Sequence, residues 1–200
     1  MGGKPMAYEI ELKAHLEESE LDRVIDALLG IPGTKALGQV NKFDMYWSST
    51  EDGDPVFRTR REMTADGPRV LFTAKPSKSR NEKGTEENQE LEFEAPDTQW
   101  DDVLSFCSGI GLQVCRLKWK KGTGYILDMD GYRIHVEILN VRFLGWFIEM
   151  EICPKSLDGF DFDAAEAALW HVLETVDVSS DAVEHRGYNR MLKAIGHDRG

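Results

Sequence analysis

Residues 8–14 read Tyr-Glu-Ile-Glu-Leu-Lys-Ala, and the rest of the chain is best interpreted from this short stretch. In a β-strand, successive side chains point to opposite faces, so Glu9, Glu11 and Lys13 share one face. The two aliphatic residues between them share the other face. A strand with one charged face can be a solvated edge or one wall of a charged interior, and the remaining strands distinguish these possibilities.

The same alternation of charged and apolar residues recurs in most of the predicted strands. The charged positions that share one face are Glu9, Glu11, Lys13, Arg58, Arg60, Lys75, Glu90, Glu92, Arg116, Lys118, Lys120, Glu137, Glu149 and Glu151. The opposite faces are apolar, and helices need an apolar surface to pack on. If the helices cover the outside, the charged faces line the interior. We therefore predict an α+β fold of roughly seven to nine antiparallel strands in a closed or nearly closed barrel with a charged lumen.

Turn residues and hydrophobic periodicity predict where the elements begin and end. Strands are expected over residues 8–14, 36–49, 56–63, 70–75, 90–94, 112–121, 125–129, 132–139 and 146–152. Helices are expected over residues 20–29, 96–107, 162–176 and 188–195. Ser19 and Asp97 are the expected N-caps of the first two helices. Residues 77–88 are expected to form a mobile loop, and Gly122-Thr-Gly124 a turn.

Length and composition indicate one domain. The chain has 200 residues, of which 41% are apolar, so a single core can form. We expect residues 7–195 to form the domain and residues 1–6 to be a flexible leader. No stretch is long and apolar enough to span a membrane, and the start lacks the apolar region of a signal peptide.

Charge and cysteine content narrow the partners and the compartment. The formal net charge of −12 argues against DNA or RNA as the main partner, because affinity for phosphate backbones comes from Lys and Arg. Cys107, Cys115 and Cys153 form no Cys-x-x-Cys pair and are odd in number. Buried, reduced thiols in a cytoplasmic protein are the simplest account. A monomer and a homodimer are both compatible with the sequence.

A lumen with these side chains contains two kinds of charged group. Clustered carboxylates repel one another and gain from a hard cation such as Mg²⁺ or Mn²⁺, which takes oxygen ligands. Arg and Lys in the same space match phosphate oxygens, and Arg can bind them in bidentate fashion. Together they predict a site for a metal-bound polyphosphate.

Six segments in order resemble the CYTH superfamily, the triphosphate tunnel metalloenzymes. Glu9-Ile-Glu11-Leu-Lys13 is similar to the N-terminal E-x-E-x-K signature of this family. The other matching segments are Phe57-Arg58-Thr-Arg60-Arg, Leu71-Phe-Thr73-Ala-Lys75-Pro, Glu90-Leu-Glu92, Leu144-Gly145-Trp-Phe147-Ile-Glu149-Met-Glu151 and Gly187-Tyr188-Asn-Arg-Met-Leu192. The resemblance extends from about residue 7 to residue 195 and implies an eight-stranded antiparallel tunnel.

The resemblance also implies roles for individual residues. Mg²⁺ or Mn²⁺ would be bound mainly by Glu9, Glu11, Glu149 and Glu151, which together with Lys13 form the expected catalytic set. Phosphate would be bound by Lys13, Arg58, Arg60, Lys75, Arg116, Lys118 and Lys120. Arg116 could instead be a surface charge. The carboxylates of residues 90, 92 and 94 could orient the cationic side chains rather than bind metal.

Three positions depart from the family pattern. An Asp usually precedes the Leu-Gly pair, and two alignments place either Leu139 or Glu137 there. We prefer Glu137 as a further metal ligand because it keeps a carboxylate. Lys120 stands where an Arg is usual, and Asn88 stands where an Arg usually precedes the middle E-x-E. These departures bear on substrate preference more than on metal binding.

Two classes of function are compatible with such a lumen. The first is a metal-dependent enzyme, either of class IV adenylyl cyclase type, converting ATP to cyclic AMP and pyrophosphate, or a hydrolase of ATP, tripolyphosphate or thiamine triphosphate. The second is a noncatalytic module that binds polyphosphate or a nucleotide. Nothing in the sequence identifies an adenine pocket, so the reaction and the triphosphate stay open.

Overall fold

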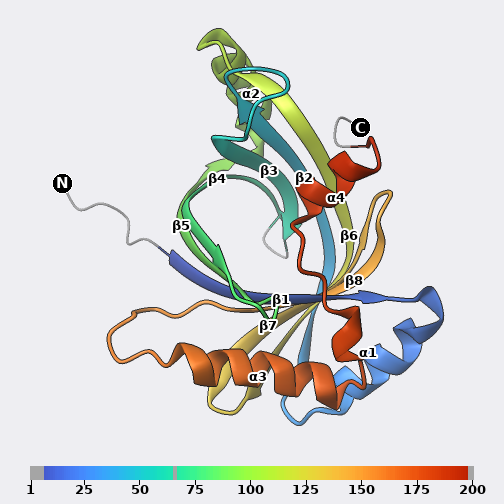
Figure 1. The fold of residues 1–200 in the computed structure, drawn as a ribbon. Coiled ribbons are helices and arrows are strands. Elements are labelled where there is room, and N and C mark those ends of the chain that lie inside the picture. The colour runs from blue at the N-terminus through green and yellow to red at the C-terminus, as the bar shows by residue number, and fades with distance from the viewer. Residues whose placement is uncertain (1–6, 65–66, 198–200) are drawn as a thin grey trace.

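The computed structural model describes residues 7–64 and 67–197 (Figure 1). The predicted leader, residues 1–6, lies outside the described residues. The strands are β1 (Ala7–Leu16), β2 (Lys35–Ser48), β3 (Phe57–Thr64), β4 (Gly67–Arg80), β5 (Glu86–Pro96), β6 (Gln113–Met129), β7 (Tyr132–Val141) and β8 (Gly145–Ile152). The helices are α1 (Leu21–Gly30), α2 (Trp100–Gly109), α3 (Phe162–Thr175) and α4 (Tyr188–Ala194).

The eight strands form a closed antiparallel barrel in the order β1-β5-β4-β3-β2-β6-β7-β8. β1 closes the barrel because it pairs with β5 on one side and β8 on the other. The register places Glu9 opposite Asn88 and Glu11 opposite Glu151. The predicted closed barrel and α+β class are therefore confirmed.

The main core lies between the barrel and two of its helices. α3 buries Ala165, Ala168, Leu169, Val172 and Leu173, which recur at the helical spacing that forms one apolar face. This face and that of α1 pack on the outward apolar residues of β1, β6, β7 and β8. Figure 1 shows α1 and α3 on the same side of the barrel, beneath β1 and β7. The charged alternate positions of these strands therefore face the lumen.

A smaller core covers another part of the barrel. Val103 and Cys107 of α2 pack on Trp47 of β2, with neighbouring apolar residues of β2, β3, β4 and β6 around them. Figure 1 places α2 at the opposite end of the molecule from α1 and α3. Cys107 and Cys115 are buried, as expected, whereas Cys153 is exposed, so the expectation of buried thiols is wrong for this residue.

Two predicted connections are strands in the structure. β6 continues through Gly122-Thr-Gly124, so the predicted turn there is wrong. A Cβ on Gly122 would lie 1.9 Å from the carbonyl oxygen of Ile138, which explains the glycine by close backbone approach. The predicted loop 77–88 is also wrong in extent, because β4 runs to Arg80 and β5 begins at Glu86.

Both predicted N-caps are wrong. A single 3₁₀ turn, Glu18–Glu20, precedes α1, and Glu17 and Glu20 form the capping box instead of Ser19. A second 3₁₀ turn, Asp97–Gln99, precedes α2, so Asp97 lies within the turn. Its carboxylate pairs with the Arg61 guanidinium, at 2.5 Å from Nε, which ties the start of this turn to β3.

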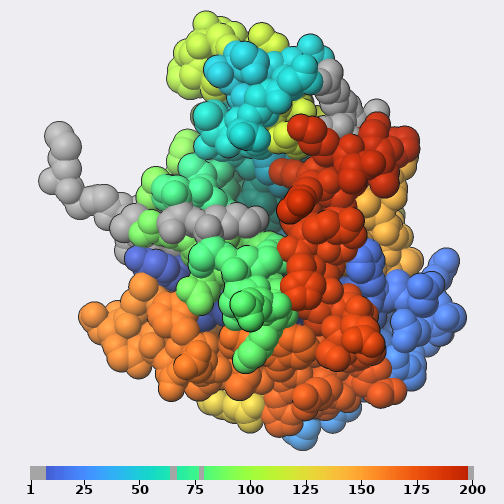
Figure 2. All heavy atoms as spheres, viewed as in Figure 1, coloured from blue at the N-terminus to red at the C-terminus, as the bar shows by residue number. Residues whose placement is uncertain are grey.

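The C-terminal segment crosses the barrel after α3. In Figure 2 it runs in red across the front of the molecule, up to α4. Val183 forms an isolated bridge with Ala14 of β1, and the Glu184 amide donates to the carbonyl oxygen of Lys13 at 3.0 Å. Tyr188 and Met191 of α4 then pack with Phe147 of β8. The segment therefore brings a tyrosine to the interior side chains of β1 and β8.

None of the helices within the described residues is both long enough and apolar enough to cross a membrane.

Candidate functional site

The lumen has two walls of opposite charge. The acidic wall comes from β1, β5, β7 and β8, where Glu11 lies opposite Glu151, and Glu149 lies opposite both Lys13 and Glu137. The cationic wall comes from β2, β3 and β6, where Asp44 lies between Arg60 and Lys118. The strand alternation that the sequence predicts therefore brings all of these charged groups into one interior.

Glu9 and Glu151 interact directly within the acidic wall. Burial raises the pKa of Glu151 to about 7, a hydrogen bond with His135 opposes this, and the charge of Glu9 adds to it. Burial also raises the pKa of Glu9, but Lys75 outweighs burial through its charge and hydrogen bond and holds this pKa below the ordinary value. The Lys75 Nζ lies 2.7 Å from Glu9 Oε2 and 2.7 Å from Glu90 Oε1. One lysine thus compensates two carboxylates.

Two further acidic residues of the predicted metal set, Glu149 and Glu137, are each held by a lysine. Lys120 Nζ lies 2.5 Å from Glu149 Oε2, and Lys42 Nζ lies 2.5 Å from Glu137 Oε1. Burial raises the pKa of Glu149, but the charge and hydrogen bond of Lys120 bring it down to about 2. The pKa of Glu137 is lowered in the same way by Lys42 and Lys120 against the effect of burial. Both groups are therefore carboxylates at neutral pH.

The donor set of the acidic wall fits a hard divalent cation. All the side chains supply oxygen, and the repulsion between Glu9 and Glu151 is of the kind that such a cation relieves. The amide of Asn88 donates to Glu9 Oε2 at 3.1 Å, while its own Oδ1 is buried without a hydrogen-bond partner. In the part of the chain that the structure describes, no three His, Cys, Asp or Glu side chains already lie in coordination geometry. The carboxylates would have to leave their lysines to bind a cation.

The cationic wall is organised by Asp44 of β2, which is completely buried. Arg60 donates to both carboxylate oxygens, from Nε to Oδ1 at 2.6 Å and from Nη2 to Oδ2 at 3.0 Å. Lys118 Nζ and Arg58 Nη1 lie 3.1 Å and 3.8 Å from Oδ2. Burial raises the pKa of Asp44, but these cations outweigh it and hold the pKa well below its usual range.

Tyr188 of α4 faces three lysines of the lumen. Its ring centroid lies 5.5 Å from Lys13 Nζ, 5.3 Å from Lys118 Nζ and 4.7 Å from Lys120 Nζ, within the range of cation–π interactions. Lys13 is also 3.7 Å from Glu11 and 3.6 Å from Glu86, and only 2% of it is exposed. The helix after the barrel thus completes the surroundings of the first motif.

The remaining predicted residues divide between the lumen and its support. Arg116 is buried, so the alternative of a surface charge is wrong. Glu92 accepts a hydrogen bond from Thr73 at 2.9 Å, and Thr73 accepts one from Arg58 at 2.9 Å. Glu92 therefore orients an arginine through a threonine, as the non-metal alternative supposed.

Sequence reasoning missed several residues of this interior. Lys42, Asp44 and Tyr46 alternate on β2 in the same way as the recognised motifs, and this alternation was the available signal. Glu86 extends the acidic face of β5 beyond the predicted strand and pairs with Arg80. Tyr188 could not be placed from periodicity alone, because its position depends on how the C-terminal segment crosses the barrel.

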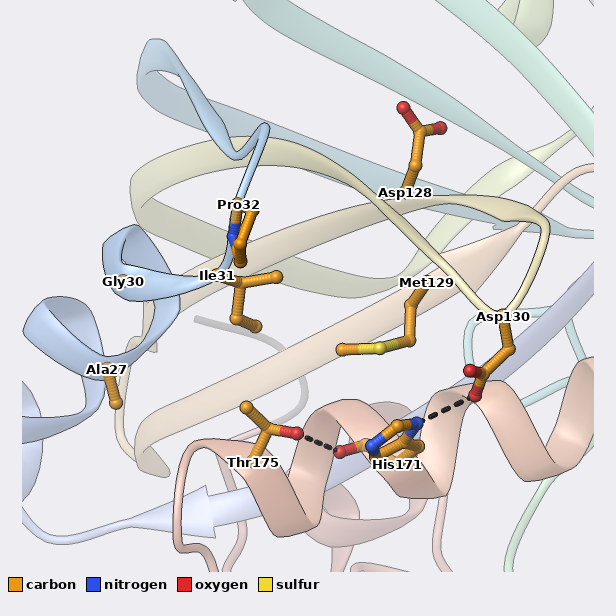
Figure 3. A pocket seen from close by; sticks show the side chains of 9 residues that line it. All are labelled: Ala27, Gly30, Ile31, Pro32, Asp128, Met129, Asp130, His171 and Thr175. Atoms are coloured by element: carbon orange, nitrogen blue, oxygen red, sulfur yellow. Dashed lines mark hydrogen bonds and ion pairs between the residues drawn. The ribbon is translucent and has the colours of Figure 1, made fainter.

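A cavity outside the lumen is lined by residues that make structural contacts. It measures about 560 Å³ and is lined by α1, the β6–β7 turn and α3 (Figure 3). The His171 ring lies 2.7 Å from Asp130, and Thr175 donates to the His171 carbonyl oxygen at 2.7 Å. In Figure 3 the Asp128 carboxylate points away from this pair. The contact ties the β6–β7 turn to α3 and brings together no catalytic set.

No family model and no curated protein matches this chain. Solved structures do match its fold. The PH1819 protein of Pyrococcus horikoshii superposes with a TM-score of 0.70 at 22% identity, covering 94% of this chain and 99% of that one. A candidate adenylate cyclase of Vibrio parahaemolyticus gives 0.67 at 16% identity, covering 96% and 99%. A candidate adenylyl cyclase of Hippeastrum, with a dominant triphosphatase activity, gives 0.59 at 14% identity, covering 96% of each chain.

These similarities concern the arrangement of the backbone along nearly the whole length of each chain. They agree with the eight-stranded closed barrel of this chain. The chain therefore shares its fold, a closed eight-stranded antiparallel barrel, with two candidate adenylate cyclases, one of which has a dominant triphosphatase activity.

Proposed function

We propose that this chain is a divalent-metal-dependent enzyme that acts on a triphosphate-bearing small molecule inside the barrel. The observation that carries the proposal is the opposition of an oxygen-rich wall and a cationic wall across one lumen. A cation bound to a polyphosphate is complementary to both walls at once. The fold similarity to cyclases and a triphosphatase supports the same class of substrate.

The acidic wall would hold Mg²⁺ or Mn²⁺. Its ligands would come from Glu9, Glu11, Glu137, Glu149 and Glu151. When bound, such an ion supplies Lewis-acid stabilisation of phosphate oxygens. In this proposal Lys75 and Lys120 lose their carboxylate partners and gain phosphate oxygens, so each lysine exchanges one anion for another.

The cationic wall would bind and orient the phosphate chain. The residues proposed for this are Lys13, Arg58, Arg60, Lys75, Arg116, Lys118 and Lys120. Their charges offset the negative charge that develops on phosphate oxygens in the transition state. Loss of one such group typically costs on the order of 10²-fold in rate.

Two reactions are compatible with the same clamp. In hydrolysis, water attacks the terminal phosphorus, the P–O bond to the next phosphate breaks, and orthophosphate forms as the shortened phosphate chain leaves. In cyclisation, the 3′-hydroxyl of ATP attacks the α-phosphorus, the α–β bond breaks and pyrophosphate leaves. Cyclisation also requires the adenosine to be held with its hydroxyl in line. The Hippeastrum protein, a candidate adenylyl cyclase with a dominant triphosphatase activity, supports keeping both reactions in the proposal.

Product analysis tests the proposal. The protein is incubated with Mg²⁺ or Mn²⁺ and with ATP, tripolyphosphate or thiamine triphosphate. Cyclic AMP with pyrophosphate identifies a cyclase, and orthophosphate identifies a hydrolase. Glu11→Gln should abolish metal-dependent turnover, whereas Glu87→Gln, an exposed glutamate on the neighbouring strand β5, should not change it. Full activity of Glu11→Gln would refute the site assignment.

A noncatalytic binding module is the competing function. The departures at Asn88 and Lys120 favour it, because a site that lacks two of the usual guanidinium groups can bind a polyphosphate and turn it over slowly. Thermal stabilisation by Mg²⁺ and tripolyphosphate, without any product after prolonged incubation, would support this function over the enzyme.

A further inference from the structure

We propose that Asp44 is a positioning residue that pre-aligns Arg60 and Lys118 for the phosphate chain. This proposal rests on the proposed function, since it concerns the same lumen. Asp44 belongs to neither the metal set nor the phosphate set. It acts through the two cations that it holds.

The position of Asp44 follows from the sheet. β2 lies between β3 and β6, and the register puts Asp44 directly opposite Arg60 on one side and Lys118 on the other. Directly opposed residues of an antiparallel pair have their Cβ atoms close together, so one short side chain reaches both neighbours. No residue of β3 or β6 could reach both in this way.

The Asp44 carboxylate fixes the plane of a guanidinium. Its two oxygens accept from Nε and Nη2 of Arg60 at 2.6 and 3.0 Å. A bidentate pair of this kind sets both distance and orientation. Nη1 is the guanidinium nitrogen that Asp44 leaves available for a ligand.

Lys118 is held by two residues of the same strand, Asp44 and Tyr46 of β2. Its Nζ lies 3.1 Å from Asp44 Oδ2 and donates to the Tyr46 hydroxyl at 2.7 Å. Burial lowers the pKa of Lys118, whereas Tyr46 and Asp44 raise it, so these two residues help to keep the ammonium charged. β2 therefore orients the lysine and partly opposes the lowering of its pKa by burial.

Asp44 differs from Glu9 and Glu149, two other carboxylates that pair with lumen cations. Glu9 and Glu149, which pair with Lys75 and Lys120, are themselves proposed metal ligands. Those pairs must open when a metal binds. Asp44 lies on the cationic wall, so its pairs with Arg60 and Lys118 persist, and the lumen keeps one preset pair of phosphate-binding groups.

A double-mutant cycle in ligand affinity tests this role. Binding of tripolyphosphate in the presence of Mg²⁺ is measured by calorimetry for the wild type, Asp44→Asn, Arg60→Lys and the double variant. In the wild-type background Arg60→Lys should weaken binding about 10-fold, because the aligned fork is lost. In the Asp44→Asn background the same change should weaken binding by less than about 3-fold, because the fork is no longer aligned.

A structural ion pair would give a different result. It would couple the two residues in unfolding but leave their effects on tripolyphosphate affinity additive, and additive affinities would overturn the proposal. If Asp44→Asn does not fold, Asp44→Glu keeps the charge and displaces the carboxylate by one methylene. The effect of Arg60→Lys on affinity should shrink in that background too, and an undiminished effect would overturn the proposal.

The same measurements separate this proposal from the proposed enzyme. If the affinities are coupled but no triphosphate is turned over, the result would contradict the proposed enzyme and support the positioning role of Asp44. If the affinities are additive and turnover is full, the result would contradict the positioning role of Asp44 and support the proposed enzyme. A wild type that binds none of tripolyphosphate, ATP and thiamine triphosphate would overturn both proposals. With turnover, Asp44→Asn should lower kcat about 10²-fold through lost alignment.

Discussion

At the scale of single residues, the lumen is organised by compensation of buried charge. Lys75 pairs with Glu9, Lys120 with Glu149, and Asp44 with Arg60. Removing one partner of a buried pair leaves a charge that water no longer solvates, at a cost of about 3–5 kcal/mol. The same groups can therefore maintain the fold and exchange partners with a charged ligand.

Gly122 provides a test of close backbone approach. A Cβ at this position would meet the Ile138 carbonyl oxygen at 1.9 Å, so Gly122→Ala must displace β6 from β7. We expect the free energy of unfolding to fall by at least about 2 kcal/mol in urea denaturation. Gly124→Ala is the matched control, because its nearest contact is a Val40 side-chain atom at 3.3 Å. Equal losses for both variants would contradict this explanation.

Tyr188 provides a test of the cation–π contacts. Tyr188→Leu removes a ring that lies within 5.5 Å of Lys13 Nζ and closer to Lys118 and Lys120. We expect it to lower the free energy of unfolding by about 2–3 kcal/mol, through lost packing and lost attraction for buried ammonium groups. Tyr188→Phe keeps the ring and should cost less than half as much in the same urea titration. If Tyr188→Phe and Tyr188→Leu lower the free energy of unfolding by similar amounts, the effect comes from the hydroxyl and not from the ring.

At the scale of elements, hydrophobic periodicity predicted nearly every strand and helix but misjudged connections. Gly122-Thr-Gly124 has the composition of a turn, yet its glycines serve close contact with β7 inside one long strand. The polar stretch after Lys75 resembles a loop, yet β4 and β5 continue their pairing through it after a register shift. Composition alone does not distinguish a turn glycine from one required by a neighbouring strand.

Glu184 links the C-terminal segment to the barrel, and this link should weaken in acid. Hydrogen bonds from Arg186 lower its pKa to about 2, against the effect of burial, and His15 contributes in the same direction. Because the pKa is lowered from 4.5, the stability that Glu184 contributes is present above pH 4.5 and is lost as the pH falls toward 2.

Urea denaturation of Glu184→Gln at several pH values tests whether the stability contributed by Glu184 is lost in acid. At neutral pH the variant should lose about 1–3 kcal/mol relative to the wild type, as expected for charge-assisted hydrogen bonds. The difference should shrink steadily below pH 4.5, where the wild-type carboxylate begins to lose its advantage. Glu174→Gln, at an exposed position on α3, is the control and should show little loss at any pH. A constant difference across this range would rule out titration of Glu184 as the cause.

At the scale of the whole molecule, strand alternation was sufficient to predict a charged lumen but not its internal pairing. Which carboxylate meets which cation depends on barrel closure and register, as for Asp44 between Arg60 and Lys118. Lys42 and Asp44 alternate in the same way as Glu9 and Glu11, but they lie outside the six segments that resemble the family. The predicted phosphate-binding residues lie in the lumen, and their roles toward a ligand stay predictions.

The distribution of charge over the molecule predicts how salt affects stability. The chain carries a net charge of −12, while Arg60, Lys118 and Lys120 are buried in paired form, so the excess negative charge lies mainly on the surface. Salt screens repulsion between exposed charges much more than attraction between buried pairs. Raising NaCl from about 0.05 to 0.5 M should therefore stabilise the fold by about 1 kcal/mol, which corresponds to about 2–4 °C in Tm.

Scanning calorimetry at the two salt concentrations measures this effect. A variant with Glu87→Lys and Glu174→Lys carries less surface repulsion, because both positions are exposed, and its Tm should rise less with salt. A fall in Tm on adding salt would mean that exposed ion pairs such as Arg61–Asp97 outweigh the general repulsion. That outcome would be inconsistent with the low value expected of surface pairs, about 0–1 kcal/mol each. The expected rise instead follows from a fold whose buried cations are paired and whose excess negative charge lies mainly on the surface.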